Sequence, residues 1–264
     1  MLEQVKKIAR EAGKRILSFY AGDHGVTYKE DRSPLTLADQ ASHQAIVEGL
    51  QSAWPEIPII SEEGQLPAFE ERSTYQQFWL VDPLDGTKEF IKRNGEFTVN
   101  IALIENNRPV LGVVSIPVQE RLYSAARGLG AFLEVGDAAP VAICSRADFT
   151  TDHLSVSVSR SHPSGTLDAF LKKLNGIEHR PLGSSLKFCY IAEGEVDFYP
   201  RFGPLMEWDT AAAHVVAEEA GVVITGLNNE PLTYNKPDMR HPHGFIAASN
   251  QALSQWLFQR NAAD

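Results

Sequence analysis

The sequence predicts a layered α/β fold, and three features of its hydropathy pattern support this prediction. Apolar residues recur at every third or fourth position over 2–19, which is typical of an amphipathic helix. Short apolar runs separated by turn residues over 97–135 indicate an antiparallel sheet. From about residue 140, predicted strands alternate with predicted helices, which is the pattern of an α/β unit.

Two helices are predicted at the start of the chain. The apolar stripe over 2–19 defines the first, and we expect the charged Lys6 to face water. Thr36 and Asp39 have the spacing of a capping box, in which two side chains satisfy free backbone N–H groups at a helix start. They predict a second helix, which should end before Pro55 because proline interrupts helical hydrogen bonding.

The middle of the chain is predicted to consist of strands. Buried strands are indicated where apolar runs are followed at once by acidic residues. Asn106-Asn107 lies between two apolar runs and predicts the turn of a hairpin. The predicted strands are residues 57–60, 78–81, 97–103, 110–116, 121–126 and 131–135.

The second half is predicted to alternate between strands and helices, with a glycine after each helix as a stop signal. We place a boundary near residue 145. Residues 1–145 would form N-terminal helices plus an antiparallel sheet, and residues 146–264 an α/β subdomain that contains Asp209. The predicted strands are 155–159, 196–199 and 222–224, and the predicted helices are 166–175, 184–193 and 210–220.

The charge balance and the cysteines limit the class of protein. The net charge of −10 disfavours binding to duplex nucleic acid through its phosphates, so an anionic ligand needs a local source of positive charge. Cys144 and Cys189 form no CxxC pair, which suggests a reducing compartment. The charged N-terminus is unlike a signal peptide, and no apolar run approaches the roughly 20 residues of a membrane span. We therefore expect a cytoplasmic protein.

Three acidic motifs follow predicted strands or precede a predicted helix, where ligands bind in open α/β sheets. In the central motif, Asp82 and Asp85 can converge across a proline turn together with the Leu84 carbonyl. Gly86 permits close approach of a ligand, and Thr87 adds a hydroxyl. This all-oxygen set suits Mg²⁺, which would also neutralise the repelling carboxylates and hold phosphate. The motifs are Ser61-Glu62-Glu63, Asp82-Pro83-Leu84-Asp85-Gly86-Thr87 and Trp208-Asp209-Thr210.

Each acidic residue also has a structural interpretation. Asp-Pro and Asp-Gly are common turn dipeptides, and Asp209 and Asp39 could simply cap helices. Only the joint occurrence of the motifs favours a metal site. His241 and His243, by contrast, are expected to be solvated in a polar tail.

The three motifs, in this order and spacing, resemble the metal-dependent, lithium-sensitive phosphatase superfamily of inositol monophosphatase. Within it, residues 88–98 and 183–188 look like the bacterial CysQ type of 3′(2′),5′-bisphosphate nucleotidase. Inositol monophosphatases usually have Thr-Asn where this chain has Lys88-Glu89. The resemblance implies an αβαβα sugar-phosphatase fold.

The resemblance also implies a set of site residues. Two or three Mg²⁺ ions would be held by the Glu62, Asp82, Asp85 and Asp209 carboxylates and the Leu84 carbonyl. Thr87 would orient an attacking water whose proton passes to Asp39, although relatives leave the choice of base between Asp39 and Glu62 open. The implied substrate-binding residues are Gly86, Thr87, His162, Ser184, Lys187, Arg201 and Asp209.

The implied substrate is adenosine 3′,5′-bisphosphate, with its sulfated relative second, in sulfate assimilation. Lys187, near a predicted helix start at 183–185, would hold the 5′-phosphate while the 3′-phosphate leaves. The alternative for Lys187 and Arg201 is solvated surface charge. An inositol or sugar monophosphatase and a non-catalytic nucleotide-binding regulator remain as alternative functions. Peripheral association with the cytoplasmic side of the inner membrane remains open.

Overall fold

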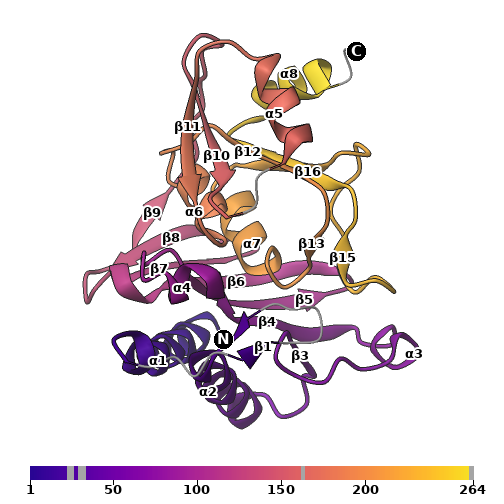
Figure 1. Cartoon of the computed structure of the whole chain (residues 1–264). Coiled ribbons are helices and arrows are strands. Elements are labelled where there is room, and N and C mark those ends of the chain that lie inside the picture. Colours follow the sequence, from indigo (N-terminus) through magenta and orange to yellow (C-terminus); the bar gives the residue numbers. More distant parts are fainter. Residues whose placement is uncertain (23–26, 29–33, 162–163, 262–264) are drawn as a thin grey trace.

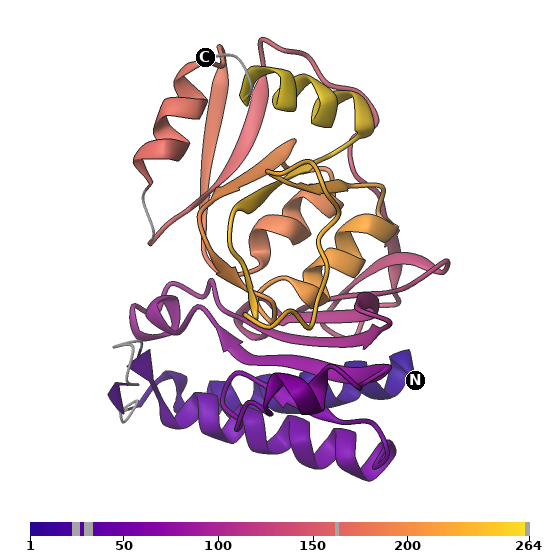
Figure 2. The same ribbon diagram turned by 90° about the vertical axis from the view of Figure 1, so that its right-hand side faces the viewer.

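The computed structural model describes residues 1–22, 27–28, 34–161 and 164–261. Over these residues the chain forms stacked layers in the order helix, sheet, helix, sheet, helix, as Figures 1 and 2 show. This arrangement confirms the predicted layered fold. None of the helices in the described part of the chain is long and apolar enough to cross a bilayer.

The first outer layer consists of α1 (Leu2–Tyr20) and α2 (Leu37–Ala53), which pack against each other and against one face of the first sheet. Both confirm the predicted helices, and the Thr36–Asp39 capping box is present. The expectation for Lys6 is wrong: it is only 6% exposed, because it lies against the sheet and pairs there with the Glu134 carboxylate. That ion pair compensates the burial of its charge.

The first sheet has seven strands in the order β3-β4-β5-β6-β7-β8-β9, all antiparallel except the β3–β4 pair. Asn106 and Asn107 both have positive φ, as a tight hairpin turn between β5 and β6 requires. The strands are β3 (Ile59–Ser61), β4 (Gln77–Asp85), β5 (Thr98–Glu105), β6 (Arg108–Ile116), β7 (Arg121–Ala126), β8 (Gly130–Val135) and β9 (Val141–Ile143). The predicted meander is thereby confirmed.

The central layer consists of α6 (Leu186–Ala192) and α7 (Ala211–Glu219), which lie between the two sheets. Small side chains let α7 approach the first sheet closely. A Cβ atom on Gly112 of β6 would lie 2.2 Å from the Ala212 carbonyl oxygen, so only glycine fits there. The helix predicted over 184–193 begins later, because Ser184 has a positive φ of 43° and belongs to a turn.

The second sheet has five strands in the order β11-β10-β12-β16-β14. The outer helices α5 (Gly165–Lys172) and α8 (Gln251–Asn261) cover its far face (Figure 2). Strands β11 and β16 and helix α8 were not predicted, and the strand expected at 196–199 is shifted to β12. The strands are β10 (Leu154–Ser159), β11 (Ile177–Leu182), β12 (Phe198–Phe202), β14 (Val223–Gly226) and β16 (Gly244–Ala248).

Short elements complete the described chain. Strands β13 and β15 form a small separate sheet beside α7, and α4 follows directly on β4. The short elements are β1 (Thr27–Tyr28), β2 (Pro34–Leu35), α3 (Phe69–Arg72), α4 (Thr87–Ile91), η1 (Pro117–Gln119), β13 (Leu205–Met206) and β15 (Arg240–His241).

Candidate active site

A cavity of about 290 Å³ lies where elements of both sheets meet. Its lining comes from the ends of β3 and β4, the start of α4, the turn before α6, strand β12 and the segment before α7. Many of the predicted site residues therefore share one cavity. Those that line it are Glu62, Asp82, Leu84, Asp85, Gly86, Thr87, Ser184, Lys187, Arg201 and Asp209.

Three carboxylates converge in this cavity. Glu62, Asp82 and Asp209 each contribute an oxygen, and these oxygens all lie within 4.8 Å of one another. Oδ1 of Asp82 accepts the backbone N–H of Leu84 at 3.1 Å, whereas its buried Oδ2 meets no hydrogen-bond partner among the described residues. Burial and mutual repulsion raise the pKa values of Asp82 and Asp209 well above the ordinary range. A hard divalent cation fits this donor set and would remove the repulsion.

Asp85 lies in the same cavity but has different neighbours. Its Oδ2 accepts from the Asn100 amide at 3.4 Å. Burial raises the pKa of Asp85 to about 6, against the attraction of the Lys187 ammonium. The bulge that shifts the β4–β5 register between Asp82 and Asp85 lets one strand direct both acids to the site.

Lys187 is only 7% exposed, so the solvated alternative for this residue is wrong. Its Nζ atom donates to the carbonyls of Leu182 (3.5 Å) and Ser184, and it lies 5.3 Å from the centre of the Tyr199 ring. Burial lowers the pKa of Lys187 to about 8, although Asp85 favours its charged form. The site thus contains a buried cation beside its acids.

Thr87 connects the cavity to Asp39. Gly86, with φ of +90°, ends β4 and lets α4 begin at Thr87. The Thr87 hydroxyl lies 3.3 Å from Oδ1 of Asp39 and 3.4 Å from the Leu84 carbonyl oxygen. Asp39 is buried, and burial raises its pKa although hydrogen bonds from Thr36 oppose the shift.

The remaining predicted substrate residues differ in what surrounds them. Ser184 lines the cavity, and its buried Oγ has no hydrogen-bond partner in the described part of the chain. Arg201 lines it too, donating from Nη2 to the Pro204 carbonyl at 2.9 Å. His162 lies outside the described residues.

Glu96, which no sequence motif predicted, joins the segment before β5 to the turn before α6. Its carboxylate accepts from Arg160 at 2.7 and 2.6 Å and from the Gly183 backbone N–H at 2.8 Å. This bond fixes the turn that presents Ser184. No local pattern could have identified Glu96, because its partners lie 64 and 87 positions away.

His241 corrects the expectation of a solvated tail. It lies in β15 with only 3% of its surface exposed, and its Nε2 is 3.1 Å from the Thr210 hydroxyl. Burial, aided by the nearby Lys236, lowers the pKa of His241 to about 3. It is therefore a neutral, hydrogen-bonded core residue next to the segment that contains Asp209.

Comparison with known proteins places the chain among close relatives. It is 47% identical to the 3′(2′),5′-bisphosphate nucleotidase CysQ of Salmonella typhimurium over 89% of this chain and 94% of the relative. It is 37% identical to the protein of that name from Haemophilus influenzae, over 99% and 97%.

Two solved structures are similar to this chain over nearly its whole length. The crystal structure of CysQ from Bacteroides thetaiotaomicron has a TM-score of 0.82 at 41% identity, covering 95% of this chain and 97% of that one. SuhB from Bartonella henselae has a TM-score of 0.83 at 25% identity, covering 98% and 97%. The sequence profile of the inositol monophosphatase family matches residues 1–260. The chain therefore belongs to the inositol monophosphatase family.

Proposed function

We propose that this protein is a magnesium-dependent 3′(2′),5′-bisphosphate nucleotidase. It would hydrolyse the 3′-phosphate of adenosine 3′,5′-bisphosphate to give AMP and phosphate, with the sulfated relative as a second substrate. The observation that supports this best is that acidic and basic side chains line the same cavity. The cavity with the three-carboxylate cluster is also lined by Lys187 and Arg201, so it offers a cationic region for a phosphate that does not react.

Glu62, Asp82, Asp85, Asp209 and the Leu84 carbonyl would hold the magnesium. The unpartnered Oδ2 of Asp82 supports this ligand set. Asp85 is not one of the three clustered acids, which favours two or three ions over one. Bound magnesium would lower the pKa of water and neutralise charge on the reacting phosphate.

The protein's own part in the reaction is to hold a water and take its proton. If the Thr87 hydroxyl donates to Oδ1 of Asp39, its oxygen lone pairs are free to accept a hydrogen bond from water in the cavity. Asp39 would then receive the proton through Thr87. Glu62 lines the cavity itself and is the alternative acceptor.

The substrate would be held through its second phosphate. Lys187 can turn its ammonium from the Leu182 and Ser184 carbonyls towards an anion, and the Ser184 hydroxyl is available as a donor. Both cysteines are free thiols, which supports the proposed cytoplasmic location.

Phosphate release from three substrates tests the proposal. Adenosine 3′,5′-bisphosphate, adenosine 3′-monophosphate and inositol 1-phosphate are each assayed with Mg²⁺ and with EDTA. We expect the bisphosphate to have the highest kcat/KM and EDTA to abolish all turnover. A higher kcat/KM for inositol 1-phosphate would contradict the proposal, and so would full activity in EDTA.

A further inference from the structure

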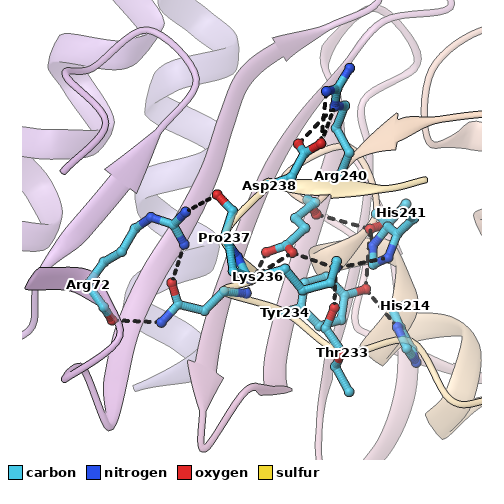
Figure 3. A network of polar contacts seen from close by, with 12 residues as sticks. Arg72, His214, Thr233, Tyr234, Lys236, Pro237, Asp238, Arg240 and His241 are labelled. Atoms are coloured by element: carbon cyan, nitrogen blue, oxygen red, sulfur yellow. Dashed lines mark hydrogen bonds and ion pairs between the residues drawn. The ribbon is translucent and has the colours of Figure 1, made fainter. Parts of the chain in front are cut away.

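The loop formed by residues 233–241 contacts the chain immediately before Asp209. Glu207 is fully buried, and its carboxylate accepts the backbone N–H groups of Asn235 (2.5 Å) and Lys236 (3.2 Å). The Lys236 ammonium forms an ion pair with the same carboxylate at 2.5 Å. Figure 3 shows Lys236 within this network. The residue two positions before Asp209 is therefore fixed to the loop by three contacts.

The same loop contacts the chain immediately after Asp209. The Thr210 hydroxyl lies 3.2 Å from the Tyr234 hydroxyl and 3.1 Å from Nε2 of His241, and it donates to the Glu207 carbonyl oxygen at 3.0 Å. That carbonyl also accepts the backbone N–H of Ala211 at 3.0 Å. Residues on both sides of Asp209 are thus tied to one loop and to each other.

The loop in turn is fastened to the first half of the chain. Arg72 of α3 is only 1% exposed and donates to the Asn235 side chain at 2.7 Å and to the Pro237 carbonyl at 2.8 Å (Figure 3). The Asn235 amide donates back to the Arg72 carbonyl at 2.7 Å. The backbone N–H of Tyr234 reaches the Asn107 carbonyl at 3.1 Å.

Stability alone is a weak reason for such a network, because burying two charges costs about as much as their pairing returns. Well-packed apolar side chains would stabilise this region equally well. An ion pair whose carboxylate is fully buried and also bonded to two backbone N–H groups does, however, restrict the backbone that holds it. In the described structure Glu207, Lys236 and Arg72 are absent from the cavity lining, so they can act on the site only indirectly, through the chain around Asp209 or through their charge.

We propose that Glu207, Lys236 and Thr210 are positioning residues that fix the Asp209 carboxylate for metal binding. The inference rests on the proposed ligand set and deepens it. Partners of metal ligands typically change metal affinity about 10–100-fold when they are removed. We therefore expect a loss of at least tenfold in metal affinity when either charged partner is replaced.

Three single variants separate positioning from plain electrostatics. Glu207→Gln removes a negative charge, Lys236→Met removes a positive charge, and Thr210→Val removes a hydroxyl without changing charge. Mn²⁺ binding to the full chain without substrate, measured by electron paramagnetic resonance, gives the dissociation constant. Positioning predicts weaker binding in all three variants. Electrostatics alone predicts weaker binding in the first, tighter binding in the second and no change in the third.

A matched control tests for general damage. Glu134 is likewise a buried carboxylate, paired with Lys6 and Arg10 at the α1 face of the first sheet. Glu134→Gln should lower the melting temperature while leaving Mn²⁺ affinity unchanged. If the three variants also lose melting temperature but bind Mn²⁺ like the wild type, or if Lys236→Met binds it more tightly, the inference is wrong. If the wild type itself does not bind Mn²⁺, the ligand set and the inference that rests on it are both wrong, whereas a wrong nucleotide substrate would leave this measurement untouched.

Discussion

Asp39 shows how one side chain can cap a helix and still be placed for the proposed proton transfer. Its Oδ2 accepts from the Thr36 backbone N–H at 2.8 Å, as part of the capping box of α2, while its Oδ1 lies 3.3 Å from the Thr87 hydroxyl. Because the two oxygens have separate partners, the cap and the proton relay do not exclude each other. Whether Asp39 only caps α2 or also accepts a proton must therefore be decided by measuring a variant.

Asp39→Asn separates the two roles. The asparagine carbonyl can keep one of these hydrogen bonds, so we expect the free energy of unfolding to change by about 1 kcal/mol or less. A residue that accepts the proton should contribute roughly 10²–10⁴-fold to kcat. Turnover, Mg²⁺ dependence and melting temperature are measured together. A kcat equal to that of the wild type would leave Asp39 with the cap alone.

Lys187→Met tests the anion site at the scale of one charge. Methionine keeps an apolar stem over the Tyr199 ring and removes the ammonium. A charge-assisted contact contributes on the order of 1.5–3 kcal/mol, so KM for adenosine 3′,5′-bisphosphate should rise roughly ten- to a hundredfold. Adenosine 3′-monophosphate, which has no second phosphate, should be affected far less. Equal losses of kcat/KM on both substrates would show that Lys187 only supports the site.

Among the elements, those with local signals could be predicted from the sequence. Helix α2 has its capping box, and the β5–β6 hairpin has its Asn-Asn turn. Strand β11 could not be predicted, since residues 178–180 are exposed and polar and Pro181 follows them, and the strand exists only because it pairs with β10. The burial of Lys6 likewise depends on Glu134, which is distant in sequence.

Residues in and around the candidate site likewise differ in whether the sequence alone reveals them. Glu62, Asp82 and Asp85 stand next to apolar strands, so their place at strand ends is visible in the sequence. Glu207 has no such signal. An acid beside Trp208-Asp209 is indistinguishable in sequence from a solvated one until its contacts with residues 235–236 are known.

Gly112→Ala tests the contact between β6 and α7. The added methyl group would overlap the Ala212 carbonyl, so α7 must move. We expect a loss of roughly 1–3 kcal/mol in the free energy of unfolding, and weaker Mn²⁺ binding because Asp209 lies two residues before the start of α7. Gly165→Ala in α5 is the control, since nothing lies within 4 Å of its Cβ position. Urea denaturation distinguishes the two, and equal stability would contradict the close approach.

At the scale of the whole molecule, the buried Asp85 carboxylate of the cavity opposes the fold that buries it. Burial raises the pKa of Asp85 from 3.8 to about 6, so its ionisation costs stability. The stability that the protonated Asp85 carboxyl contributes is fully present below pH 3.8, and it is lost as the pH rises through about 6. Without metal, Asp85→Asn should therefore be more stable than the wild type at pH 8, by up to about 3 kcal/mol at 1.36 kcal/mol per pKa unit.

Urea unfolding of both proteins in EDTA between pH 4 and 8 measures this difference. The gain of Asp85→Asn should shrink as the pH falls below about 6, and titrations of groups that do not interact with Asp85 cancel between the two proteins, that of His241 included. With Mg²⁺ the order should reverse, because a ligand that binds the folded state stabilises the wild type more. If Asp85→Asn is the less stable protein at pH 8 in EDTA, burial of this carboxylate is not a cost.

The order of the acids along the chain has a consequence for synthesis. Glu62, Asp82 and Asp85 leave the ribosome more than a hundred residues before Asp209. At about 5–20 residues per second, the first three acids wait on the order of ten seconds for the fourth. A nascent or prematurely terminated chain that ends before Asp209 therefore lacks one of the three clustered carboxylates. We expect such a polypeptide to lack the proposed activity, so that nucleotide turnover would report only on chains that have been translated at least as far as Asp209.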